Sequence, residues 1–365
     1  MHSCGYNNEK PIHYRKRIMT INTSIQAILE QAQAGKIPSR EECVQLLQLP
    51  EQSYESALLR ATADQLSRVK FGQAGMLLAQ IGIEIAPCPA NCTFCSFARG
   101  YTDLPASKMS LDDIFLHGKH LTAHENLHSL FLMTMHDFDF DNLLQAVSEL
   151  RKHLPADVDI VVNIGDFERQ QANELHVAGV KGAYHVRRLR EGIDNTLDVE
   201  ERWRTIENIR HAGMDWYTCC EPIGPEHTPQ EIIDQIFEAY AMGCFQNAAM
   251  RRVALPKSPL FSRGQISELR LAQIVSVVFL AGLECKELKS LAVHEPNELG
   301  LLSGANCIYA EAGANPRDTE AQTERSRGFG LADCERLFME CGYAQVVLPS
   351  GKHADLQSNR IKLFT

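Results

Sequence analysis

The sequence predicts an α/β fold, a (β/α)8 TIM-type barrel preceded by an N-terminal helical extension. Two observations lead to this prediction. From Gln80 onward, short apolar runs alternate with amphipathic helical stretches at intervals close to the ~30 residues of a βα unit. Eight such runs are present, and eight parallel strands with crossing helices close into a barrel. The alternative is a partial barrel of six strands, because the closed count depends on the last two runs.

Each predicted strand is a short apolar run, and the predicted helices lie between these runs. The strands are expected at 81–85, 129–133, 158–163, 182–186, 215–218, 248–253, 289–293 and 306–310. Helices are expected at 141–153, 168–178, 200–212, 229–241 and 267–281. In such a barrel, chemistry belongs to the loops that follow the carboxyl ends of the strands.

The chain is expected to divide into four segments. Residues 1–22 are polar and predict a flexible N-terminus, within which Met19 is an alternative start. Residues 23–78 form the helical extension, since apolar residues recur at helical spacing and Ser39 followed by Glu42 is a helix-start signal. The barrel is expected at 79–342, and the tail at 343–365 contains no candidate functional residues.

Composition is typical of an enzyme of the cytoplasm. The chain has 365 residues, 44% of them hydrophobic, which is enough to bury a large core. Its twelve cysteines are expected to be reduced, because a disulfide scaffold would be much shorter and the start of the chain has no long apolar core of a signal peptide. No apolar run reaches membrane-spanning length. The net charge of −10 argues against nucleic acid as a partner.

Three cysteines, Cys88, Cys92 and Cys95, directly follow the first predicted strand in the stretch IEIAPCPANCTFCSFAR. Their spacing is C-x3-C-x2-C, and three thiolates on one short loop can ligate three corners of a four-iron, four-sulfur cluster. The fourth iron then has no protein ligand. The alternatives are a zinc knuckle, which needs a fourth Cys or His nearby, and a set of buried thiols, which does not explain the polar insert between the first two cysteines.

This spacing, with the aromatic Phe94 just before the third cysteine, resembles the signature of the radical S-adenosylmethionine (SAM) superfamily. The resemblance implies a [4Fe–4S] cluster on the three cysteines, and SAM bound at the open iron beside Phe94. One electron would cleave SAM to methionine and a 5′-deoxyadenosyl radical, which abstracts hydrogen from a small-molecule substrate. It also implies an electron donor such as flavodoxin or ferredoxin.

Over residues 80–342 the sequence is similar to the biotin synthase-like group, which includes biotin synthase, the hydrogenase-cofactor maturases and methylornithine synthase. One similar segment is GANCIY at 304–309, and another is NIGDF at 163–167 before a helix. The maturases carry an apolar-Gly-Glu-aromatic sequence there, with the carboxylate on the methionyl amine of SAM. The resemblance assigns this contact to Asp166, although Asp has a shorter reach than Glu. The alternative for Asp166 is ordinary capping of the following helix.

Two further cofactor-binding candidates follow the fourth and fifth predicted strands. Arg187 is the candidate for a bidentate clamp on a carboxylate of SAM or of the substrate, with its neighbour Arg188 as the alternative. A solvated basic rim would explain both arginines equally well. Glu221 follows the fifth strand, where its carboxylate would face the cofactor or substrate unless it is a solvated loop acid.

The sequence departs from biotin synthase at the ligands of the second, sacrificial cluster. Those ligands include cysteines on strands two and three, and the corresponding runs FLMTMHD and IVVN contain none. Four other cysteines could form a different site or be small apolar core residues: Cys219, Cys220, Cys244 and Cys307. Since Cys219 and Cys220 are adjacent on a strand, at most one of them can face into the barrel.

Polar residues also follow strands six to eight, and they either line a pocket or stabilise the loops. They include Arg251, the pair His294 and Glu295, Glu311 and Arg317.

Two classes of function follow from the whole sequence. One is a radical SAM enzyme, most simply in cofactor or vitamin biosynthesis, with biotin synthase-like sulfur insertion as its variant. The other is a non-catalytic iron–sulfur or zinc protein. Polar residues at so many strand ends favour the enzyme.

Overall fold

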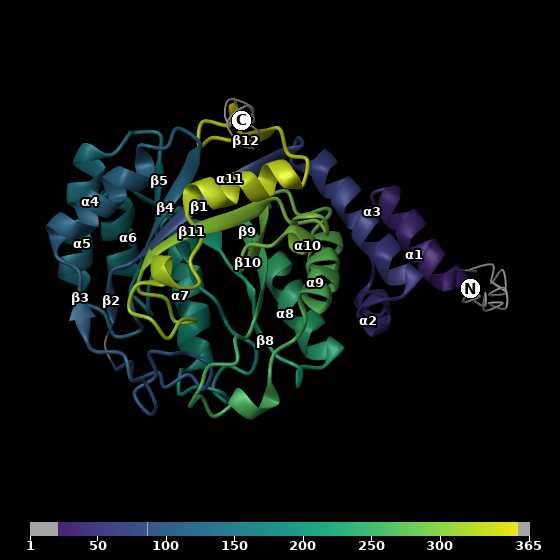
Figure 1. Ribbon diagram of the computed structural model, residues 1–365, viewed down its shortest axis with the longest axis horizontal. Helices are drawn as coiled ribbons and strands as arrows, with labels where there is room; N and C mark the ends of the chain where they lie inside the picture. Colours follow the sequence, from purple (N-terminus) through teal and green to yellow (C-terminus); the bar gives the residue numbers. More distant parts are fainter. Residues whose placement is uncertain (1–20, 86, 357–365) are drawn as a thin grey trace, which may run out of the picture.

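Eight strand positions form the closed parallel barrel that the sequence predicts (Figure 1). The structure is a computed structural model that describes residues 21–85 and 87–356. Apart from its last two residues, the expected flexible segment 1–22, with Met19, lies outside the described residues. Around the ring the strands are β1 (Ala74–Gly82), β4 (Leu127–Met133), β5 (Asp159–Asn163), β6 (Val180–Tyr184), β7 (Asp215–Tyr217), β9 (Gln246–Arg251), β10 (Ser290–His294) and β11 (Cys307–Gly313).

The ring closes because β11 pairs in parallel with β1. Their register runs from Met76 beside Cys307 to Gly82 beside Gly313. At the fifth position the chain makes a second short strand, β8 (Cys220–Ile223), which also pairs with β9. β8 was not expected, because the sequence of this stretch was interpreted as the loop after the fifth predicted strand.

Helices surround the barrel on the outside. They are α4 (Leu111–Thr122), α5 (Phe140–His153), α6 (Arg169–Val177), α7 (Val199–His211), α8 (Pro229–Met242), α9 (Glu268–Ala281), α10 (Glu298–Leu301) and α11 (Leu331–Glu340). The five predicted helices correspond to α5–α9. Side-chain caps help to set their starts: Asp139 accepts from Asn142 N–H before α5, and Thr228 forms a capping box with Glu231 at the start of α8.

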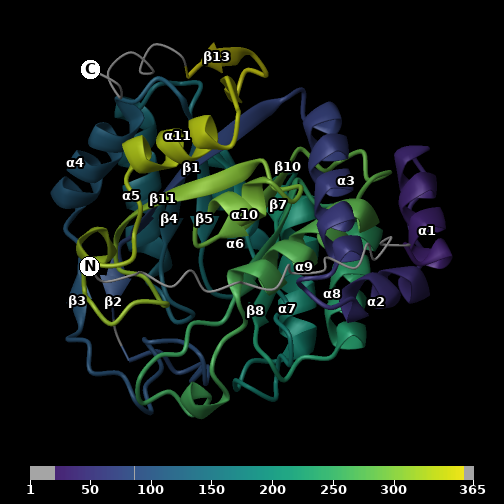
Figure 2. The same cartoon turned by 45° about the vertical axis from the view of Figure 1, so that its right-hand side comes forward.

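The N-terminal extension consists of α1 (Thr23–Gln33), α2 (Arg40–Gln48) and α3 (Tyr54–Lys70), which lie on the side of the barrel against α8 and α9 (Figures 1 and 2). Polar contacts tie it there. The Gln273 side chain donates to the carbonyls of Leu46 and Leu49, and the Ser67 hydroxyl donates to the carbonyl of Gly304. The extension therefore supports the outer helices and lies away from the strand ends.

The first strand begins earlier than expected. Instead of spanning 81–85, β1 starts at Ala74, inside the segment predicted as helical, and Glu84–Ile85 forms a separate short strand, β2. The reason is burial: every residue of β1 is buried, so the run has no alternation that separates it from the preceding helix. β2 pairs with β3 (Ser107–Lys108) outside the barrel.

The C-terminal segment adds two strands near the amino end of the barrel. β12 (Gln345–Val347) pairs with β1 at Ala74 and Gly75, and β13 (His353–Asp355) pairs with β12. Two short 3₁₀ turns, η1 (Phe261–Arg263) and η2 (Thr323–Arg325), lie in the loops after β9 and β11. The predicted boundaries at 78 and 342 stay predictions.

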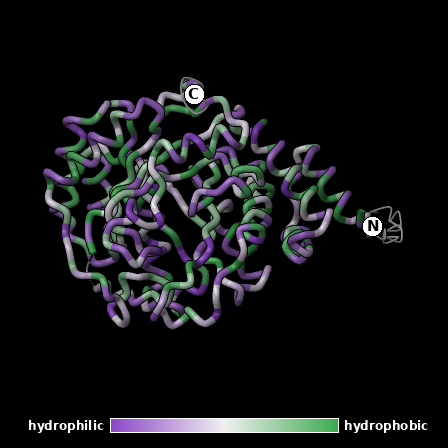
Figure 3. The backbone as a smooth tube through the Cα atoms, viewed as in Figure 1, coloured by the Kyte–Doolittle hydropathy of each residue, from purple (hydrophilic) through white to green (hydrophobic). Residues whose placement is uncertain are grey.

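The hydrophobic core has two main parts, as expected for a barrel, and a smaller third cluster lies around the cysteine loop. One part lies between the strands and the outer helices, and the other fills the barrel interior with side chains such as Phe131, Tyr217 and Tyr309. Figure 3 shows hydrophobic and hydrophilic residues interspersed along the whole described chain. Among the described residues, none of the helices is both long and apolar enough to span a membrane.

Candidate functional site

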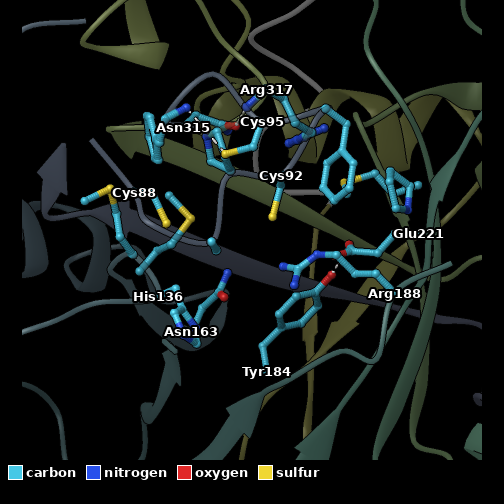
Figure 4. A pocket seen from close by; sticks show the side chains of 18 of the residues that line it. Cys88, Cys92, Cys95, His136, Asn163, Tyr184, Arg188, Glu221, Asn315 and Arg317 are labelled. Atoms are coloured by element: carbon cyan, nitrogen blue, oxygen red, sulfur yellow. Dashed lines mark hydrogen bonds and ion pairs between the residues drawn. The ribbon is translucent and has the colours of Figure 1, made fainter. Parts of the chain in front are cut away.

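A cavity opens at the carboxyl ends of the barrel strands, and all eight strand positions contribute side chains to its wall. One residue from each position, in ring order, is Gln80, Met133, Asn163, Tyr184, Glu221, Met250, His294 and Tyr309. Active sites of barrels of this type lie at this end. The loop with the three cysteines covers one side of the cavity (Figure 4).

Cys88, Cys92 and Cys95 all line the cavity. Backbone hydrogen bonds hold their loop in place: Cys88 N–H donates to Phe97 O at 2.8 Å, and Arg99 N–H donates to Cys88 O at 3.1 Å. The structure therefore brings the three predicted ligands together on one short, hydrogen-bonded loop.

The hydroxyl of Tyr101 holds the second half of this loop from outside. It donates to the carbonyl of Cys92 and accepts from Cys95 N–H at 3.0 Å. Between the two cysteines, Thr93 N–H donates to Asp194 O at 2.8 Å. The loop is thus attached to the segment after β6.

The spacing of the three sulfur atoms argues against tetrahedral zinc. With Zn–S bonds of about 2.3 Å, tetrahedral thiolates lie about 3.8 Å apart. Within the described residues, one trio of His, Cys, Asp or Glu has all its ligand atoms within 4.8 Å of one another, and it is not the cysteines. Three thiols that line one cavity can ligate three corners of an iron–sulfur cluster. Burial raises the pKa of the Cys92 thiol to about 11 although Arg188 lowers it, so cluster binding must displace the proton.

The trio at closer spacing is Asp194, Glu226 and His227. Its imidazole is unsuited to a cation, because Nδ1 accepts the backbone N–H of Gly224 at 2.9 Å. Burial lowers the pKa of His227, so the ring is neutral and carries its proton on Nε2. Neither nitrogen then has a free lone pair for a metal.

Phe94 lines the cavity, as expected for a cofactor contact. It packs with the cysteine loop in a small apolar cluster that also contains Met133 and Met135 at the end of β4. An aromatic ring and two thioethers thus form an apolar surface beside the three thiols.

Asp166 lies behind the cavity wall instead of on it. Its Oδ1 accepts from Arg202 at 3.0 Å, from the Thr205 hydroxyl at 3.0 Å and from His185 Nε2 at 2.9 Å. Burial alone would raise the pKa of Asp166, but the hydrogen bond from His185 and the charge of Arg202 hold it well below its usual value. The N-cap of α6 is Glu168, so helix capping is not the role of Asp166 either.

The partner that reaches the cavity is Arg202, which sequence reasoning missed. It lies in the first turns of α7, and nothing in a helical stretch of charged residues marks one arginine as inward-facing. Gly165 allows this arrangement, because a Cβ there would lie 1.9 Å from the carbonyl oxygen of His136. The NIGDF segment therefore packs directly on the loop after β4.

The two arginines after β6 separate in the structure. Arg187, the favoured candidate, is not on the cavity wall: its guanidinium pairs with Glu238 on α8 and lies 5.5 Å from the ring centre of Trp203 on α7. Arg188 lines the cavity instead. Adjacent residues of an extended segment point to opposite sides, so only one of the two can face inward. Figure 4 shows Arg188 reaching toward the cysteines.

Glu221 lies on the cavity wall, as expected, and is nearly fully buried. Its Oε1 is 3.0 Å from Arg188 Nε, and its Oε2 accepts from the Tyr184 hydroxyl at 2.6 Å. Burial alone would lower the pKa of Arg188, but Glu221 raises it, so the guanidinium stays charged. Glu221 thus orients Arg188 and leaves the terminal nitrogens of its guanidinium facing the cavity.

The wall formed by β10 and β11 combines a neutral imidazole with an ion pair. His294 stacks on Tyr309 at 4.7 Å, and its Nε2 has no hydrogen-bond partner among the described residues. Burial and the charge of Arg317 lower the pKa of His294 to about 3. Arg317 donates to Glu311 at 2.8 Å. His294 and Glu295, considered together in the sequence, are separate here, since Glu295 pairs with other residues, Arg251 and Arg327.

The remaining cysteines do not converge on the cavity. Cys219 and Cys307 point into the barrel interior, whereas Cys220 and Cys244 pack in the core between strands and helices. This confirms that only one of the adjacent pair at the end of the fifth strand faces inward. None of these four sulfur atoms belongs to a metal-spaced trio within the described chain.

No protein-family model matches the chain. Curated relatives are biotin synthases: the Carboxydothermus hydrogenoformans protein is 25% identical over 293 residues, covering 75% of this chain and 89% of the relative. The Renibacterium salmoninarum protein is 23% identical over 343 residues, covering 88% and 98%. The matches to the Corynebacterium urealyticum and Schizosaccharomyces pombe biotin synthases span only 56% and 39% of those relatives.

Two solved structures have the same fold. Methylornithine synthase (PylB) superimposes with a TM-score of 0.74 at 15% identity, covering 86% of this chain and 96% of that protein. The FeFe-hydrogenase maturase HydG from Carboxydothermus hydrogenoformans superimposes with a TM-score of 0.71 at 17% identity, covering 88% and 79%. At these identities the structures support the fold.

Proposed function

Since this chain is a radical SAM protein of the biotin synthase-like group, whose cofactors are a [4Fe–4S] cluster and SAM, we propose that it is an enzyme acting on a small molecule. Three residues, Cys88, Cys92 and Cys95, hold the cluster. The bound cofactors supply one chemistry, the one-electron cleavage of SAM to methionine and a 5′-deoxyadenosyl radical that takes hydrogen from the substrate. We assign the reaction to cofactor or vitamin biosynthesis in the cytoplasm, with an external protein as electron donor.

The main support for the proposal is the position of the three thiols, which line the cavity at the carboxyl ends of the barrel strands. A cluster held by three cysteines has one iron without a protein ligand. The three thiols line a cavity that also has aromatic, amide and charged groups on its wall, and this cavity would hold SAM and a substrate together. A storage or carrier protein has no need of such a cavity.

Different residues of the chain bind SAM and the substrate. Arg188, oriented by Glu221, offers the terminal nitrogens of its guanidinium to a carboxylate. Phe94 supplies an apolar contact beside the cluster. Asp166 acts through Arg202, which it holds at the cavity wall, instead of touching the cofactor. His294 and the Arg317–Glu311 pair line the rest of the cavity, and we assign them to binding of the substrate.

The test of the proposal is release of 5′-deoxyadenosine. Protein reconstituted anaerobically with iron and sulfide, then given dithionite and SAM, is expected to release 5′-deoxyadenosine and methionine in equal amounts. Absence of both products from a preparation with a full cluster would refute the enzyme assignment and favour a non-catalytic iron–sulfur protein.

Arg188 and Arg187 provide a matched pair for testing the carboxylate clamp. Replacing Arg188 with alanine is expected to weaken SAM binding by about one to two decades, because a charge-assisted hydrogen bond contributes about 1.5 to 3 kcal/mol. Arg187→Ala is expected to leave the affinity unchanged, since that side chain pairs with Glu238 outside the cavity. Equal losses in both variants, measured by equilibrium dialysis with labelled SAM, would mean that the inward position of Arg188 does not matter.

Sulfur insertion is the second candidate function, and the interior cysteines Cys219 and Cys307 are the residues it would use. We predict that no second cluster is present, because several protein ligands must converge to hold one and, among the described residues, Cys219 and Cys307 are the only two cysteines of the interior core cluster. Iron and sulfide are expected at about four of each per chain, the content of one cluster. A reproducible excess that disappears in the Cys219→Ala/Cys307→Ala variant would restore sulfur insertion.

A further inference from the structure

A second cavity lies at the opposite end of the barrel from the cysteine loop, and we call it the amino-end cavity. Its volume is about 480 Å³, which is typical of a small-molecule site. Met76 and His128 line it from near the starts of β1 and β4, and Phe245, Lys289 and Asn306 line it from the positions directly before β9, β10 and β11. Because the barrel strands are parallel, the cavity lies at their amino ends, away from the three thiols.

The N-terminal extension and the C-terminal hairpin form two further walls of the amino-end cavity. Lys70 and Phe71 come from the end of α3, and Val347 and Leu348 come from the end of β12 and the turn that follows it. Pairing of β12 with β1 holds the hairpin in place, and Leu348 N–H donates to Lys352 O at 2.8 Å. The cavity therefore depends on two segments that lie outside the barrel itself.

The amino-end cavity is basic, and its cations have no carboxylate partners. Three lysines line it, Lys70, Lys286 and Lys289, and no aspartate or glutamate does. Within the part of the chain that the structure describes, they contact backbone carbonyls instead of acids. Lys70 Nζ donates to the carbonyls of Leu283 and Cys285, each at 3.0 Å, and Lys289 Nζ donates to the carbonyl of Lys286 at 2.9 Å.

Two acids of the adjoining segments have other partners. Asp215 lies 3.6 Å from Lys181. Burial raises the pKa of Asp215, and Lys181 and, more weakly, Lys289 oppose this rise. Glu287 Oε2 accepts from the Cys285 thiol at 3.7 Å. Since neither carboxylate lines the cavity, the charge of the lysines is available to a ligand.

The lysines are close enough together to repel one another. Burial lowers the pKa of the Lys70 ammonium, and the charge of Lys289 lowers it further although Cys285 opposes this. His128 adds no charge, because burial lowers its pKa to about 4. A bound anion would relieve the repulsion between the lysines.

Two phenylalanine rings give the amino-end cavity an aromatic surface. Phe71 packs edge-on against Phe279 with 6.0 Å between the ring centres, and Phe245 packs against Tyr217 at 5.0 Å. Both rings are thus held from behind, and both stay partly exposed on the side of the cavity. A flat nucleobase can stack on such a ring.

We propose that the amino-end cavity binds a 5′-mononucleotide, with its phosphate at the lysines and its base against the phenylalanine rings. A lysine ammonium is a compact charge with three donors, which suits a phosphate. Lys70 keeps one of its three N–H groups beyond those given to carbonyls, and Lys289 keeps two. No bond is formed or broken in this cavity, and the inference does not depend on the proposed function.

The experiment is calorimetry with AMP, GMP, CMP and UMP on the reconstituted protein in the presence of saturating SAM, which occupies the cysteine-lined cavity. Lys286→Ala/Lys289→Ala removes two exposed lysines and is expected to weaken binding by about tenfold or more and to reduce its salt dependence. Phe71→Leu is expected to weaken binding by about tenfold, because stacking is lost. The matched control, Lys36→Ala/Lys119→Ala, removes the same charge from exposed positions remote from the cavity and is expected to change nothing.

Four results would each overturn the inference. They are no binding of any of the four nucleotides at millimolar concentration, equal losses in the control and in the lysine variant, displacement of the nucleotide by SAM, and binding of inorganic phosphate as tight as that of AMP. If Phe71→Leu does not fold, comparison of AMP with inorganic phosphate still tests the contribution of the rings. A protein that fails to bind SAM would count against the proposed function alone, because the lysine variant tests the amino-end cavity without SAM.

Discussion

Replacing Cys88, Cys92 and Cys95 together with alanine is expected to abolish the broad visible absorbance of the cluster and all cleavage of SAM. The reason is that all three cluster ligands lie on one loop, and no other cysteine among the described residues lines the cavity. The measurement is iron and sulfide content after reconstitution, together with 5′-deoxyadenosine release.

The control for this prediction is another accessible cysteine. Cys285, which is partly exposed and remote from the cavity wall, is expected to tolerate replacement by serine with the cluster intact. Circular dichroism should show that the triple variant keeps its fold, because the barrel core does not depend on the cysteine loop. A full cluster in the triple variant would mean that the ligands lie elsewhere.

Asp166→Ala is expected to reduce the free energy of unfolding by about 3 to 5 kcal/mol. The variant leaves the buried cation of Arg202 without its closest partner, and removing one member of a buried ion pair costs about this much. It also removes the acceptor of the His185 and Thr205 hydrogen bonds. The measurement is urea-induced unfolding at neutral pH.

Two variants separate the ion pair from the remaining contacts. Asp166→Asn keeps an acceptor for the hydrogen bonds and is expected to lose less stability than the alanine variant. The double change Asp166→Ala/Arg202→Met is expected to cost less than the sum of the two single changes, since neither charge is then buried alone. Simple additivity would contradict the account of this network.

The same network predicts a pH dependence. The folded-state pKa of Asp166 lies below its unfolded value of about 3.9, so its stabilisation is present in full above that pH and is lost as the pH falls toward the folded-state value. The gap in stability between the original protein and Asp166→Asn should therefore narrow with acid below about pH 4. A gap that stays constant would mean that the charge of Asp166 is not responsible.

Most of the barrel was predictable from the sequence, because buried strands and amphipathic helices alternate regularly along the chain. The first strand was placed too late, because every residue of β1 is buried and the run therefore shows no alternation that marks a strand. The second short strand at the fifth position, Cys220–Ile223, carries no separate apolar run and was missed.

The candidate site was predictable where spacing along the chain determines proximity, as in the three cysteines. The direction of a side chain was not predictable where two neighbouring residues of the same type could each face the cavity. Arg187 and Arg188 are identical in type, and only the packing of Trp203 and Glu238 shows which of them faces outward. Likewise, Asp166 is at the expected segment, but the contact with Arg202 joins residues 36 positions apart.

The most direct test of the account is Mössbauer spectroscopy of protein reconstituted with ⁵⁷Fe, before and after addition of SAM. With three cysteine ligands and one open corner, SAM is expected to change the signal of one iron in four and leave the other three unchanged. A spectrum that does not respond to SAM, or a reconstituted protein that binds one zinc and no iron, would contradict it.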